Sequence, residues 1–178
     1  MRINFYALRA IYFHEMDRFR RTLIQSLLSP VLSTSLYFIV FGSVIGDYVQ
    51  KIDGISYGSY IVPGLLMLTL LTQSISNTSF GIFFPKFNGT IYEILAAPIS
   101  TVEIVIAYVG AGATKTLIVA AVIFCTSLFF AEVNVKFPLL MIFLLILVAF
   151  TFALFGFLIG LLSKNFEQMS IIPTIVIT

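Results

Sequence analysis

Four long apolar runs restrict this chain to one class of fold. They cover residues 23–45, 57–84, 102–130 and 137–162, and each is long enough to cross a bilayer as an α-helix. Hydrophobic residues make up 60% of the 178 residues and charged residues 10%, whereas about 25% of the residues of a soluble domain are charged. A soluble chain of this length could not bury so much apolar surface. The sequence therefore predicts an all-α polytopic membrane protein that spans the lipid bilayer.

The two ends of the chain are expected to behave differently from the four spans. Residues 1–21 predict an amphipathic helix in the membrane interface, because Phe5, Leu8, Tyr12, Met16 and Phe19 share one stripe. The basic side chains of this helix fall outside the stripe: Arg9, Arg18, Arg20 and Arg21. Residues 169–178 are apolar but too few to cross a membrane. We expect them to be the start of a fifth segment in a truncated chain, with a re-entrant tail as the alternative.

The basic residues predict the orientation. If the N-terminus is cytoplasmic, the cytoplasmic side holds Arg2, Arg9, Arg18, Arg20, Arg21, Lys86 and Lys164, and only Lys51 and Lys136 lie outside. This follows the positive-inside rule. The net charge of +2 is too small to indicate a nucleic-acid partner.

The stretch from Pro85 to Ser100 is then a cytoplasmic loop between two spans. Gly89 can end one helix, and Thr90 with Glu93 fits a capping box at the start of the next. Pro98 ends that helix, because the residue before a proline is disfavoured in the helical region. The pattern predicts a short helix over 90–97 on the membrane surface.

No catalytic residue or metal site is predicted, because the sequence lacks a Cys/His pairing, a phosphate-binding loop and a carboxylate pair within a span. The exceptional residue is Lys115, which is costly inside a span unless it is paired or hydrated. Glu103 is roughly 20 Å away along the same helix, too far to pair with it. Lys115 therefore either faces a watery or substrate pathway, or pairs with a backbone carbonyl or an absent helix.

Small and polar residues add two packing hypotheses. Gly156 and Gly160 form a G-x-x-x-G pair that would let another helix approach closely. The inner half of the second span is unusually polar, which indicates either interhelical hydrogen bonds or the lining of a pathway: Ser74, Ser76, Asn77, Thr78 and Ser79.

The order of these features resembles the permease subunits of type 2 ATP-binding cassette (ABC) exporters. The group nearest in pattern is the nodulation-factor or lipo-oligosaccharide exporter permeases and their bacterial relatives. Two runs carry the resemblance, Tyr57-x-x-Tyr60-Ile61-Val62-Pro63-Gly64 and Gly89-Thr90-Ile91-Tyr92-Glu93-Ile94-Leu95-Ala96-Ala97-Pro98-Ile99-Ser100.

The resemblance implies a single transmembrane domain over 1–178, C-terminally incomplete relative to a six-span permease. It implies that residues 90–97 are a coupling helix that docks on an ABC ATPase subunit through Gly89, Thr90, Glu93, Ile94, Leu95 and Pro98. Residues 1–21 would be the elbow helix beside it.

By the same resemblance, the protein is not itself an enzyme. It would bind no cofactor, with ATP and Mg on the partner subunit, and would form a homodimer in the bacterial cytoplasmic (inner) membrane. It would export a polysaccharide, a lipo-oligosaccharide or a drug-like molecule by alternating access. The alternatives are a secondary transporter or a non-transporting membrane assembly subunit.

Overall fold

The computed structural model describes residues 4–45, 51–52, 55–131, 133 and 135–177. In this part of the chain four helical segments are long and apolar enough to cross a membrane. They are Leu23–Gly42, Tyr57–Asn88, Thr101–Ser127 and Pro138–Leu162. The predicted all-α polytopic membrane fold is therefore confirmed.

The first of these segments is formed by α2 (Leu23–Tyr37) and the first part of the π-helical η1 (Phe38–Ile45). A minimal antiparallel pair, β1 (Lys51–Ile52) and β2 (Ile55–Ser56), leads into α3 (Tyr57–Asn88). The short α4 (Ile91–Ala96) connects α3 to α5 (Thr101–Ser127), which is followed by α6 (Pro138–Leu162).

Small residues let the central helices approach closely. α6 crosses α3 at Gly156 and Gly160, where an added Cβ would lie 2.5 Å from the carbonyl oxygens of Ile75 and Ser79 respectively. The hydroxyl of Ser74 donates a 3.2 Å hydrogen bond to the Ala149 carbonyl of α6. This is one of the interhelical hydrogen bonds that the polar inner half of the second span indicated.

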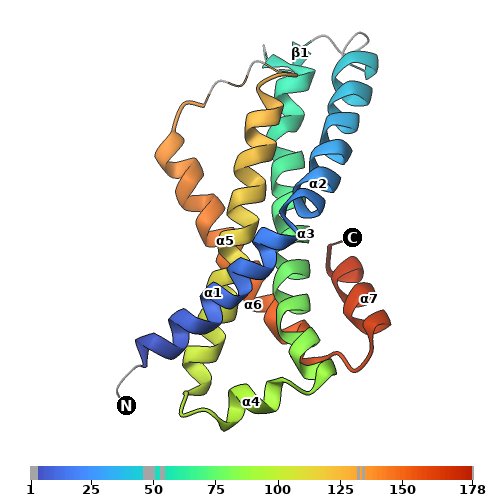
Figure 1. Ribbon diagram of the computed structural model, residues 1–178. Coiled ribbons are helices and arrows are strands. Elements are labelled where there is room, and N and C mark those ends of the chain that lie inside the picture. Colours follow the sequence, from blue (N-terminus) through green and yellow to red (C-terminus); the bar gives the residue numbers. More distant parts are fainter. Residues whose placement is uncertain (1–3, 46–50, 53–54, 132, 134, 178) are drawn as a thin grey trace.

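The remaining helices lie against this bundle toward one end (Figure 1). α1 (Phe5–Arg21) runs obliquely across the half of α5 that follows α4, and α7 (Phe166–Ile177) turns back beside α3. The N-terminal end of the described chain and α4 lie at this end, whereas β1 lies at the other. The ring of Phe166 anchors the start of α7 through edge contacts with Phe83 and Phe87, at centroid distances of 5.0 and 4.9 Å.

Candidate functional site: a charged cavity and an exposed connecting helix

α1 presents one buried face to α5, and this face carries a carboxylate. Asn4 caps the helix by accepting a 3.3 Å hydrogen bond from the Ala7 amide. The buried positions of α1 are Ile11, Glu15 and Phe19, spaced by four residues. The buried face therefore differs from the predicted apolar stripe at the start of the helix, where Phe5 is 70% exposed.

Glu15 holds two cations. Its Oε2 atom lies 2.7 Å from Lys115 Nζ and 2.9 Å from the Arg18 guanidinium, while no partner of Oε1 is seen among the described residues. Glu15 and Lys115 are only 2% and 3% exposed. A charge at such a position is tolerated because the oppositely charged partner compensates for much of its lost hydration.

Lys115 is therefore paired with a side chain of α1, a partner that neither sequence hypothesis named. The sequence does hold a signal for this partner. Glu15 falls between Tyr12 and Phe19 on the apolar face of the first helix. An acidic side chain on an apolar stripe and a lone lysine in an apolar span are complementary anomalies.

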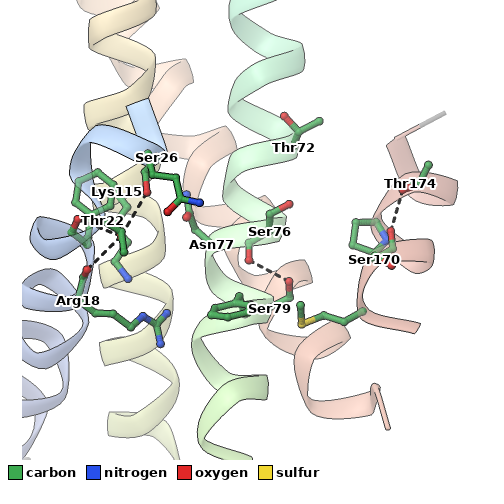
Figure 2. A pocket seen from close by; sticks show the side chains of 15 residues that line it. Arg18, Thr22, Ser26, Thr72, Ser76, Asn77, Ser79, Lys115, Ser170 and Thr174 are labelled. Carbon is green, nitrogen blue, oxygen red and sulfur yellow. Dashed lines mark hydrogen bonds between the residues drawn. The ribbon is translucent and has the colours of Figure 1, made fainter. Parts of the chain in front are cut away.

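A cavity of about 710 Å³ lies beside this ion pair, where α1 meets α2 and where α3 and α7 face it (Figure 2). Arg18 and Lys115 contribute its charged groups. Its polar lining comes from Thr22, Gln25, Ser26, Thr72, Ser76, Asn77, Ser79, Ser170 and Thr174. Its apolar lining comes from Phe19, Phe80, Met169 and Pro173.

The polar half of α3 has both of the roles that the sequence offered as alternatives. Ser74 makes an interhelical hydrogen bond to α6. Ser76, Asn77 and Ser79 line the cavity.

The turn between α3 and α4 depends on Gly89. This residue ends α3 in the left-handed region with φ of 80°, which a residue with a Cβ rarely adopts. The predicted capping box at Thr90 and Glu93 is wrong. Thr90 makes no side-chain cap, and its hydroxyl instead donates to the Pro85 carbonyl at 3.4 Å. The reason is that Thr90 has helical dihedrals, whereas a capping side chain needs an extended backbone.

The capping box lies at the next helix. Ser100, in the extended region, accepts from the Glu103 amide, and the Glu103 carboxylate accepts from the Ser100 amide at 2.8 Å. The other Glu103 oxygen accepts from the backbone amide of Asn4. One carboxylate therefore ties the start of α5 to the start of α1.

α4 shows two different faces. Ile91 and Ile94 pack against the hydrophobic core, whereas Tyr92 and Leu95 are 73% and 60% exposed. Glu93 is exposed with them. Of the six residues predicted to dock on a partner, Glu93 and Leu95 thus face outward from α4, whereas Ile94 faces the protein. Tyr92 also faces outward, although the sequence did not single it out.

The other predicted residues occupy a range of environments. Thr90 and Pro98 are exposed at either end of α4. Of the elbow-helix arginines, Arg9, Arg20 and Arg21 are exposed, whereas Arg18 is partly buried against Glu15 and Phe80. Among the described residues no group of three or more His, Cys, Asp and Glu side chains could hold a metal ion.

The fold defines a multi-pass α-helical membrane protein with a short exposed helix between two spans and a charged cavity beside them. The chain belongs to the ABC-2 type transporter family, whose model matches residues 6–178. It is 38% identical over 178 residues to the inner membrane transport permease YadH of Escherichia coli K12, covering 100% of this chain and 70% of the relative. The YadH permease of Shigella flexneri matches with the same identity and coverage. No solved structure matches significantly.

Proposed function

We propose that this chain is the permease subunit of an ATP-driven exporter in the bacterial inner membrane. The observation that carries the proposal is α4, a short helix between two membrane-capable helices whose outer face exposes Tyr92, Glu93 and Leu95. Apolar and aromatic side chains exposed on a short connecting helix are typical of a docking surface. Family membership and the naming of its relatives as inner membrane transport permeases support this choice.

In this proposal α4 is a coupling helix that docks on a separate ABC ATPase subunit. Gly89 and Pro98 delimit the helix, and Ile94 holds it against the membrane domain. Closure of the ATPase on ATP would displace α4, and α3 and α5 would tilt with it to exchange inward- and outward-facing states. ATP and Mg would be bound by the ATPase, and this chain would bind no cofactor.

The proposed orientation places α4 and the N-terminus in the cytoplasm. Lys86 and Lys164 lie near the same end of the bundle as α4, while β1, which contains Lys51, lies at the opposite end (Figure 1). Basic residues are enriched on the cytoplasmic side of membrane proteins. Arg9, Arg20 and Arg21 would then face lipid headgroups from the elbow helix.

A second copy of the permease is part of the proposal. α2 exposes an apolar stripe at four-residue spacing, formed by Ile24, Leu28, Leu32 and Leu36. Such a stripe suits lipid or the matching helix of a second copy. The proposed substrate is a polysaccharide, a lipo-oligosaccharide or a drug-like molecule, which are the classes exported by the type 2 ABC permeases that the sequence resembles.

One observation favours a secondary transporter as a second candidate. Such proteins place paired ionisable residues inside their membrane domain, and Glu15 of α1 forms a buried ion pair with Lys115 of α5. The two candidates differ in their energy source. Transport by the purified complex in vesicles that is blocked by vanadate and persists without an ion gradient favours the exporter, whereas gradient-driven transport without ATP favours the second candidate.

The docking surface is tested with the full-length permease expressed together with its ATPase. The paired change Tyr92→Ala and Leu95→Ser should reduce both co-purification of the ATPase and substrate-stimulated ATP hydrolysis. Leu162→Ser is the matched control, because Leu162 is 75% exposed at the end of α6 and lies outside α4. Retention of the ATPase and of stimulated hydrolysis by a normally expressed paired variant would exclude α4 as the docking element.

A further inference from the structure

The cavity beside α1 carries one unmatched positive charge. Arg18 and Lys115 share the single carboxylate of Glu15. None of the other described residues that line the cavity is acidic. A monoanionic ligand would neutralise this charge, and a cation would be repelled by it.

Arg18 is the cation that a ligand could reach. Its side chain is 29% exposed, against 4% for Lys115, whose Nζ atom faces Glu15. The Arg18 guanidinium lies 5.5 Å from the centre of the Phe80 ring, which helps to fix its orientation. A guanidinium has five N–H donors, so the contact with Glu15 leaves others for a second anion.

The rest of the lining indicates a ligand with both polar and apolar parts. Asn77 on α3 places an amide on the side of the charged residues, and Ser76 adds a hydroxyl to the lining nearer α7 (Figure 2). Phe19, Phe80 and Met169 provide apolar walls. The volume of about 710 Å³ falls in the range of roughly 300–1,000 Å³ typical of small-molecule sites.

We propose that this cavity binds the headgroup of a singly anionic amphiphile, with Arg18 contacting the anion and the apolar walls contacting the start of its chain. Glu15 acts as a positioning residue, because it holds Arg18 at the cavity from the buried side. This inference rests on the proposed transport function only where it asks whether the bound ligand is transported, because binding itself needs no ATP.

The test uses the full-length permease with its ATPase in nanodiscs of phosphatidylcholine. Binding of two probes with the same acyl chain, lysophosphatidylglycerol and lysophosphatidylcholine, is measured at equilibrium without ATP. The wild type should prefer the anionic probe. Arg18→Gln should weaken binding of lysophosphatidylglycerol roughly tenfold to a hundredfold, as expected when a hydrogen bond to a charged group is lost. Binding of lysophosphatidylcholine should stay unchanged.

Arg9→Gln is the matched control. It removes the same charge from the same helix, and Arg9 also lies over a phenylalanine ring, 5.2 Å from the centre of Phe13, but it does not line the cavity. This variant should bind both probes as the wild type does. Equal weakening by Arg9→Gln and Arg18→Gln, or a wild type without preference for the anionic probe, would overturn the proposal.

Two further measurements keep the inference testable. If Arg18→Gln expresses poorly, Arg18→Lys and Asn77→Leu take its place. The first should retain part of the preference for the anion, and the second should weaken binding of the anionic probe. Wild-type affinity and preference in Asn77→Leu would overturn the proposed site.

Addition of ATP distinguishes a resident lipid from a cargo. Release of the bound anionic probe on ATP addition identifies cargo, and retention identifies a resident lipid. Both results support the site. If the probe binds as expected but hydrolysis is not coupled to α4, the proposed function fails and the site stands. If hydrolysis is coupled but the preference is absent, the site fails and the proposed function stands.

Discussion

The buried ion pair between α1 and α5 makes an asymmetric prediction about stability. In Lys115→Met the Glu15 carboxylate keeps Arg18 at 2.9 Å. In Glu15→Leu the ammonium of Lys115, whose residue is 3% exposed, keeps no ion-pair partner among the described residues. The two single changes should therefore differ, although each removes one half of the same pair.

The magnitudes follow from the cost of an uncompensated buried charge. Removing one partner of a buried pair costs about 3–5 kcal/mol, whereas replacing both by apolar side chains is often nearly neutral. We expect about 3 kcal/mol of destabilisation for Glu15→Leu and about half of that for Lys115→Met, because Arg18 still compensates the carboxylate. The double variant should lose less than Glu15→Leu alone, which gives a coupling energy of at least about 1.5 kcal/mol.

The assay is reversible unfolding of the purified full-length chain in mixed micelles of mild detergent and dodecyl sulfate, for the wild type, both single variants and the double variant. Asp17→Leu is the control, because Asp17 is an exposed acid two residues away on the same helix. It should change the free energy of unfolding by less than about 0.5 kcal/mol. Additive single-variant effects, or a Glu15→Leu variant as stable as Asp17→Leu, would refute the argument.

Three further predictions concern packing and helix ends. Gly156→Ala should lower stability by about 2 kcal/mol, because its Cβ would meet the backbone of α3 at 2.5 Å, whereas Gly64→Ala, with open space around its Cβ, should be neutral or stabilising in the same unfolding assay. Lys86→Met should cost about 1 kcal/mol in that assay, because the Lys86 ammonium donates to two backbone carbonyls at the end of α6. Glu103→Ala should speed hydrogen exchange of the amides at the starts of both α1 and α5, and faster exchange at α5 alone would contradict the tie between the two helices.

Hydropathy alone predicted the all-α membrane fold, because a long apolar run is the main requirement for a membrane span. The ends of the helices were less predictable, since they depend on local backbone geometry. Thr90 and Ser100 are each followed three residues later by a glutamate, so the sequence pattern is the same at both places. Only Ser100 has the extended backbone that lets its side chain cap a helix, whereas Thr90 has helical dihedrals.

The candidate site was predictable only in part. Lys115 stands out in the sequence because a lysine is costly inside an apolar span. Its partner was missed because the first helix was treated as an element of the membrane surface, with no face toward the spans. The polar half of the second span gave a pathway lining as one of two hypotheses, but the sequence could not place the cavity, because its lining comes from five helices whose relative placement the sequence does not state.

The two carboxylates together explain how α4 could act on the cavity. Glu103 joins the first turn of α5 to the amino end of α1, and Glu15 joins the middle of α1 to Lys115. Because both contacts bridge the same two helices, α1 is held at two points along α5 and should move with it. α4 leads directly into that capped turn through Ser100. If α4 is the docking helix, its displacement would therefore be transmitted to α1, which carries Arg18 at the wall of the cavity.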